Sequence, residues 1–314
     1  MTVAKAPRTL AIFTSLCLSS AAILGLSGCG DKEEPKEEPK PEKPKLPERP
    51  DEAELAPEKT LDLSGPKAPE ASTVFFAVDG ALVPLACFDK DKGELRGGVD
   101  CGKMVADGES VYVQSEFTKA LDVIGGPKNA LCEVDDNPTS RSATSVDGGA
   151  AYDFAVWPKA AAPLVQAAPS ESLSERATQF EDGEKEALLA AIDKAKSSAS
   201  KGELRLKQKV KLDIDGDGTP ETFFAAVMAH PSSADRNLFT GVFMAPGGDI
   251  SAITMVEQSK RDTDVVVLNG TVDLDGDGKH ELWTGLSYDG GSGDRIVKLE
   301  GGKAEALSKW SCGA

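Results

Sequence analysis

The sequence predicts an α+β protein that consists predominantly of antiparallel β-structure. Its hydrophobic stretches are short and are separated by turn residues, which is typical of antiparallel sheets. Residues 184–196 have the clearest amphipathic helix pattern in the chain. An acidic, glycine-rich loop occurs twice between strand patterns, which predicts a β-sheet module built around a repeat. We therefore expect a small β-rich N-terminal module at 71–170, followed at 171–314 by one helix and a sheet module with two Asp loops.

Strand patterns begin the first module. Residues 72–78 and 81–88 are apolar and flank Asp79-Gly80, a favourable hairpin turn. The other elements expected here are strands at 111–114 and 151–157, a short helix at 117–124 and a connector at 159–172.

The second module is expected to start with the helix at 184–196. Leu188, Leu189, Ile192 and Ala195 share one face, while acids at its start and lysines at its end match the helix dipole. Strands are then expected at 203–213, 221–229, 237–244, 250–256, 264–273, 281–288, 294–300 and 303–310.

The first 28 residues have the pattern of an export signal. Lys5 and Arg8 precede an uncharged apolar run at 10–26, which is short for a membrane-spanning helix and fits a signal-peptide core. The run ends in Leu26-Ser27-Gly28-Cys29, which resembles the lipobox of bacterial lipoproteins. The alternatives are an ordinary secretory signal or an uncleaved anchor.

The lipoprotein resemblance implies that Cys29 is the lipidation site. In that family the cysteine thiol receives a diacylglycerol, with acyl chains of the palmitate kind, and the signal is cleaved just before it. Gly30 follows Cys29, whereas an aspartate at that position is the family's usual signal for retention in the inner membrane. The resemblance therefore implies a protein of the bacterial cell envelope, attached to the outer membrane through its lipid.

A disordered tether is expected at 29–70. Residues 31–70 combine proline with glutamate and lysine, and they contain few aliphatic residues and no aromatic ones. Such a segment buries too little apolar surface to offset its ordering entropy. It is either a spacer that holds a folded domain away from a membrane or a solvated tail that only aids solubility.

Four cysteines remain when Cys29 and the signal are set aside, and an even number in an exported protein predicts two disulfides. Three connectivities are possible. We favour Cys87–Cys101, which closes a local loop, and Cys132–Cys312, which ties the end of the chain to the first module.

The strongest motif is an acidic loop that occurs twice, 60 residues apart. Glycines at positions 4 and 6 allow a tight turn, so carboxylates at positions 1, 3, 5 and 9 can converge. A backbone carbonyl at position 7 would add a ligand, and six to eight oxygen ligands are typical of Ca²⁺. The first loop offers Asp213, Asp215, Asp217, Thr219 and Glu221, and the second offers Asp273, Asp275, Asp277, Lys279 and Glu281.

These loops resemble the D-x-D-x-D-G-x-x-D loops of FG-GAP or VCBS-type repeats, which lie between strands and recur with a similar period. An EF-hand would need a bidentate glutamate at position 12, where this chain has Phe224 and Thr284. The chain departs from the repeat pattern by placing glutamate at position 9. Two repeats also cannot close a propeller, which needs at least four blades. The resemblance implies two bound Ca²⁺ ions; the alternatives are plain Asp-Gly turns or, less favoured, a magnesium site.

Composition narrows the function. The chain has 35 Lys and Arg against 52 Asp and Glu, a net charge of −17, which argues against nucleic acid as a partner. Its two histidines and the absence of hydrolase motifs argue against catalysis. We expect a lipid-anchored, calcium-binding envelope lipoprotein with a non-catalytic binding or structural role and an unidentified protein or glycan partner. The alternative is an envelope hydrolase that uses a carboxylate pair in the β domain.

Overall fold

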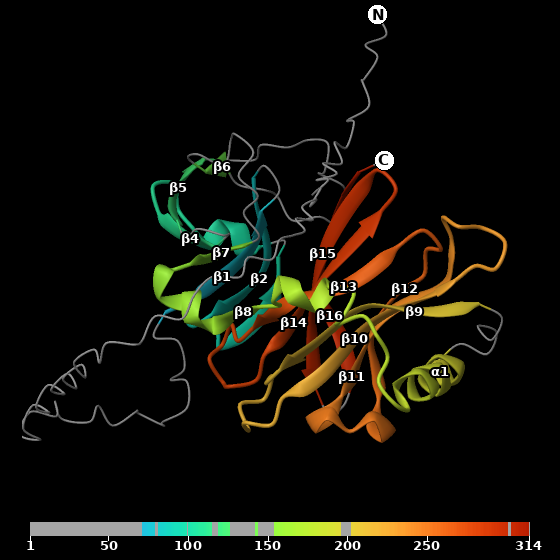
Figure 1. Cartoon of the computed structure of the whole chain (residues 1–314). Helices are drawn as coiled ribbons and strands as arrows, with labels where there is room; N and C mark the ends of the chain where they lie inside the picture. The colour runs from blue at the N-terminus through green and yellow to red at the C-terminus, as the bar shows by residue number, and fades with distance from the viewer. Residues whose placement is uncertain are drawn as a thin grey trace, which may run out of the picture. The chain divides into compact units, whose positions relative to one another are not determined.

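The computed structural model divides the chain into two compact units, 1–60 and 61–314, and all described residues belong to the second. The described residues are 71–78, 81–98, 100–114, 119–125, 142–143, 154–195, 202–300 and 303–313. Three open, antiparallel sheets carry this part of the chain (Figure 1). The predicted predominance of antiparallel β-structure is therefore confirmed. Among these residues, no helix has the length and apolar character that crossing a membrane requires.

Sheet 1 contains seven strands in the order β3-β2-β1-β7-β4-β5-β6. Its strands are β1 Thr73–Val78, β2 Leu82–Asp89, β3 Glu94–Gly97, β4 Ser110–Gln114, β5 Lys119–Gly125, β6 Ser142–Ala143 and β7 Phe154–Trp157. The helix expected at 117–124 is wrong, because β5 pairs with β4 on one side and with β6 on the other. Pairing with neighbouring strands overrides a weak local pattern in such cases.

Sheets 2 and 3 are two copies of one arrangement. Each is a meander of four consecutive antiparallel strands, and sheet 3 has an additional edge strand, β8. Sheet 2 consists of β9 Glu203–Leu212, β10 Glu221–Ala229, β11 Asn237–Ala245 and β12 Thr254–Ser259. Sheet 3 consists of β8 Val165–Ala167, β13 Val265–Val272, β14 Glu281–Tyr288, β15 Gly291–Glu300 and β16 Lys303–Gly313.

Five short 3₁₀ helices connect these elements: η1 Cys101–Met104, η2 Lys159–Leu164, η3 Ser170–Leu173, η4 Pro246–Gly248 and η5 Ile250–Ala252. The strand expected at 250–256 starts late, because Asp249 accepts a hydrogen bond from the Ser251 backbone N–H and begins η5. The connector expected at 159–172 contains β8, which pairs with β13 across the predicted module boundary.

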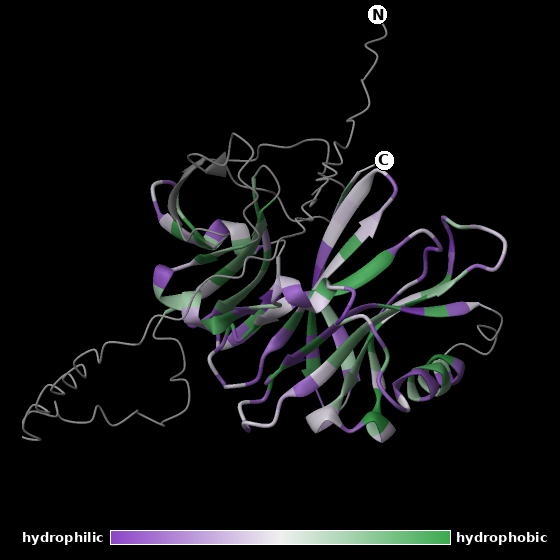
Figure 2. Cartoon of the chain, in the orientation of Figure 1, coloured by the Kyte–Doolittle hydropathy of each residue, from purple (hydrophilic) through white to green (hydrophobic). Residues whose placement is uncertain are grey.

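The predicted helix is α1, Glu184–Ala195. Leu188 and Ile192 are buried among strands of sheet 2, whereas Ala195 is exposed although it was expected on the same face. Figure 2 shows that α1 carries both hydrophobic and hydrophilic residues. The Glu184 carboxylate accepts from the Glu181 N–H and forms an ion pair with Lys209 of β9, which fastens the start of the helix to the sheet.

Sheet 3 buries both of its faces. Trp283 of β14 lies among apolar residues of sheet 1, with ring centroids 5.2 Å from Phe75 and 5.8 Å from Phe154. The preceding residue on β14, Leu282, belongs instead to a cluster with residues of sheet 2, including Phe223. This alternation places sheet 3 between two apolar cores.

The disulfide Cys87–Cys101 joins β2 to η1, with a Cα–Cα distance of 5.5 Å. Cys312 is also disulfide-bonded, to a cysteine outside the described residues. Cys132, its expected partner, and Cys29, the expected lipidation site, also lie outside them. The Cys132–Cys312 pairing therefore stays a prediction.

Candidate metal centre

Each acidic loop connects two paired strands. Leu212 at the end of β9 is opposite Glu221 at the start of β10, and Val272 is opposite Glu281 in the same way. The strand pairing therefore brings the first and last acids of each motif close together. The glycines between them adopt left-handed conformations, with φ of +71° and +83° at Gly216 and Gly218 and +69° and +85° at the two glycines of the second loop. Glycine is the residue that tolerates these conformations without strain.

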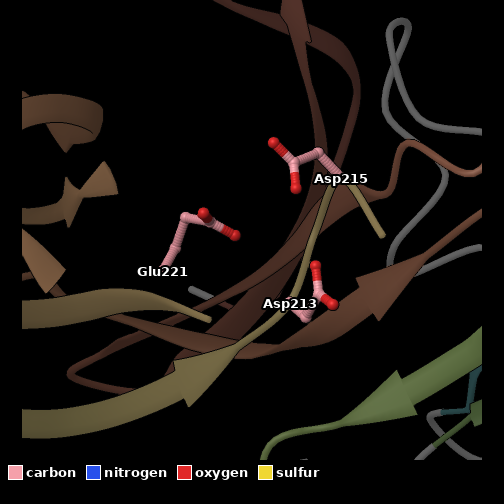
Figure 3. Close-up of side chains that lie close together, drawn as sticks. All are labelled: Asp213, Asp215 and Glu221. Carbon is pink, nitrogen blue, oxygen red and sulfur yellow. The ribbon is translucent and has the colours of Figure 1, made fainter. Parts of the chain in front are cut away.

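In the first loop, Asp213, Asp215 and Glu221 each offer a carboxylate oxygen, and these oxygens lie within 4.8 Å of one another. Glu221 directs its carboxylate toward the two aspartates (Figure 3). Asp213 is held by the backbone, since its oxygens accept from the N–H groups of Gly216 and Gly218, both at 2.9 Å.

The later part of the first loop is exposed. The Asp217 carboxylate accepts from the Thr219 N–H at 2.6 Å, and the Asp217 N–H donates to Asp215 at 3.3 Å. Asp217 is not one of the three clustered acids. The participation of Asp217 and of the Thr219 carbonyl in an ion site stays a prediction.

In the second loop, Asp273, Asp275 and Asp277 offer oxygens that lie within 4.8 Å of one another. Asp273 is only 1% exposed, and its Oδ2 accepts from the Gly278 N–H at 3.0 Å. Its other oxygen, Oδ1, is buried and has no hydrogen-bond partner among the described residues. An unpartnered buried carboxylate oxygen is costly, and a cation would satisfy it.

The electrostatics of the second loop also favour a cation. Glu281 is buried, and this burial, together with the charge of Asp275, raises the pKa of Glu281 to about 8. Burial raises the pKa of Asp275 as well, with a further contribution from Asp277. Carboxylates that resist ionisation because they are buried close together ionise readily around a divalent cation. Lys279, whose carbonyl was expected as a ligand, is exposed, and its N–H donates to Asp277 at 2.8 Å.

Hard carboxylate oxygens without nitrogen or sulfur ligands suit Ca²⁺ better than a transition metal. Each loop provides four acids of the predicted set, of which three converge in each. The structure brings together Asp213, Asp215 and Glu221 in one loop and Asp273, Asp275 and Asp277 in the other. Glu281 lies close enough to Asp273 and Asp275 for their charges to raise its pKa.

One contact in this region is not apparent from the sequence: the two loops touch. The His280 N–H in the second loop donates to the Ile214 carbonyl in the first, at 2.7 Å. The His280 ring lies 3.1 Å from the Thr271 hydroxyl. The contact is between backbone groups, so no residue type signals it.

A second polar feature is an open cavity of about 520 Å³ beside His230. Its lining includes Arg236 and Asp262, whose charged groups are 3.3 Å apart. His230 is half-buried at this cavity. Comparisons of the chain with protein-family models, with curated proteins and with solved structures find no match.

Proposed function

We propose that this chain is a lipid-anchored, calcium-binding lipoprotein of the bacterial envelope, with a non-catalytic role in binding or in envelope structure. The observation that carries the calcium proposal is the unpartnered Oδ1 of Asp273, which is buried in a group of three converging carboxylates. The first loop, which begins at Asp213, has its acids and glycines at the same positions and joins the equivalent strands of the other meander, which supports a second ion.

Calcium would act here mainly as a structural ion. Each loop joins the first two strands of a meander, β9 to β10 and β13 to β14. Without a cation the clustered carboxylates repel one another, and with Ca²⁺ this repulsion becomes attraction. The affinity expected for an extracellular module of this kind is weak, with a Kd on the order of 10⁻⁴–10⁻³ M.

Calorimetric titration with Ca²⁺ tests this proposal. The variant Asp213→Asn/Asp215→Asn/Asp273→Asn/Asp275→Asn removes two acids from each loop and should abolish the binding heat. A matched control, Asp182→Asn/Asp193→Asn, changes two exposed aspartates outside the loops and should bind as the wild type does. Equal binding by the wild type and the fourfold variant would refute the assignment of the site.

The lipid anchor is supported by the sequence Leu26-Ser27-Gly28-Cys29 after an apolar run. Metabolic labelling with a radioactive fatty acid in a bacterial host tests it. The wild type should incorporate label and fractionate with membranes, and Cys29→Ala should do neither. Labelling of Cys29→Ala at the wild-type level would contradict the proposal, and Cys17→Ala in the signal segment is the control that should leave labelling unchanged.

A further inference from the structure

The two acidic loops lie in contact, although 60 residues separate equivalent positions. The backbone N–H of His280 donates to the carbonyl of Ile214 at 2.7 Å, and these residues are position 8 of one loop and position 2 of the other. A Cβ added at Gly216 would lie 3.5 Å from the Gly278 carbonyl oxygen, so the turns of the two loops lie close together at this point as well.

The strands behind the loops are joined as well. The Gln208 side chain of β9 donates to the Leu268 carbonyl and accepts from the Leu268 N–H of β13, both at 2.8 Å. Ile214, Leu268 and Leu282 belong to one buried apolar cluster. The two loops are therefore supported by a shared, closely packed base.

The loops differ in how strongly each needs a cation. Asp273 is 1% exposed and has one unpartnered oxygen, while the equivalent Asp213 is half-buried and both of its oxygens accept backbone N–H groups. At position 3 the difference is similar: Asp275 of the second loop is half-buried, whereas Asp215 of the first loop is exposed. Calcium binding should therefore be more favourable in the second loop than in the first. The ion would satisfy a buried oxygen there, and the lower local dielectric would strengthen its attraction to the carboxylates.

We infer that the loops bind Ca²⁺ in a fixed order, the Asp273 loop first, and that filling this loop increases the affinity of the Asp213 loop. This inference rests on the proposed calcium binding. An ion in the second loop would immobilise its end, including His280, whose N–H holds the Ile214 carbonyl. Part of the ordering entropy of the first loop is then already lost when its own ion arrives, which produces positive cooperativity.

The experiment combines calorimetry with NMR of the full chain in detergent, labelled with ¹⁵N-glycine and titrated with CaCl₂. The amide signals of Gly276 and Gly278 should change at lower calcium than those of Gly216 and Gly218. In the variant Asp215→Asn/Asp217→Asn, the Kd of the first binding step should stay within about twofold of the wild-type Kd. The reason is that the first loop is empty at that step in both proteins. The reciprocal variant Asp275→Asn/Asp277→Asn should bind in loop 1 with a Kd roughly 5- to 150-fold weaker than the second wild-type step, the range typical of coupled sites.

The outcomes separate the inference from the proposed function. Two steps whose Kd values are unchanged when the other loop is inactivated would show independent sites, which overturns the coupling while calcium binding stands. If the Gly216 and Gly218 signals changed at lower calcium than those of Gly276 and Gly278, the proposed order of binding would be wrong. No calcium-dependent heat or signal change in the wild type would instead refute calcium binding itself. The amide spectra in EDTA show whether each variant is folded, because the glycines outside the loops should keep their wild-type positions.

Discussion

Replacing Gln208 by leucine should destabilise the protein markedly, because this side chain connects the two meanders. Gln208 is 3% exposed, and it forms both hydrogen bonds with the backbone of Leu268, itself 1% exposed. It also donates to the hydroxyl of Ser172 at 3.0 Å. Leucine preserves most of the volume but leaves the two backbone groups of Leu268 buried without partners.

A buried polar group that loses its partner costs about 1–3 kcal/mol. Two such groups, partly offset by the apolar gain of leucine, should lower the free energy of unfolding by about 2–4 kcal/mol. For a folded part of this size, that corresponds to a decrease in Tm of roughly 5–15 °C. Urea denaturation at fixed calcium concentration, followed by tryptophan fluorescence, measures the difference, and the m-value should stay unchanged.

The matched control is Lys207→Leu, which places the same side chain on the exposed neighbour of Gln208 in β9. It should change stability by less than about 0.5 kcal/mol, as is usual for surface positions. A Gln208→Leu variant as stable as this control would refute the reasoning, because the link between the meanders would then contribute nothing.

Three further predictions follow from the described contacts. Cys87→Ala/Cys101→Ala should cost about 3 kcal/mol by the chain-entropy estimate for this loop, whose ends are 14 residues apart, and urea denaturation of this variant beside the wild type, without reductant, checks the value. Trp283→Ala should cost about 3–5 kcal/mol in the same urea assay, because its ring packs between sheets 3 and 1; a loss below 1 kcal/mol would contradict that packing. Burial raises the pKa of Glu257 even though the carboxylate pairs with Arg295, so the folded state binds this proton more tightly than the unfolded chain does. The stability of the wild type relative to Glu257→Gln should therefore decrease as the pH rises from about 4 through the raised pKa, and a pH-independent difference between the two urea midpoints would contradict this.

The strands that position the candidate site were predictable from local patterns. Segments 221–229 and 281–288 are strands with the expected bounds, and α1 ends within one residue of its expected end. Each is a stretch with a consistent hydrophobic pattern bounded by turn residues, so local preference and tertiary structure agree. The acids and glycines of the loops likewise predicted convergence, since a left-handed turn between two paired strands brings its ends together.

The rest depended on contacts between distant segments. The strand β5 has a local pattern compatible with a helix, and β8 is only three residues long, so pairing with neighbours defines both. The stacking of sheet 3 against both other sheets, and the hydrogen bond from the His280 N–H to the Ile214 carbonyl, also leave no signature in residue type. Backbone contacts of this kind are available to any side chain.

Thermal unfolding in calcium, magnesium and EDTA tests the central claim most directly. Two sites with a Kd on the order of 10⁻⁴–10⁻³ M should together add about 3–5 kcal/mol at roughly 10 mM Ca²⁺, by mass action on the folded state. The Tm should then be roughly 6–20 °C higher in calcium than in EDTA, with a much smaller increase in magnesium. An identical Tm in calcium and EDTA would contradict the proposal that these two loops hold calcium ions.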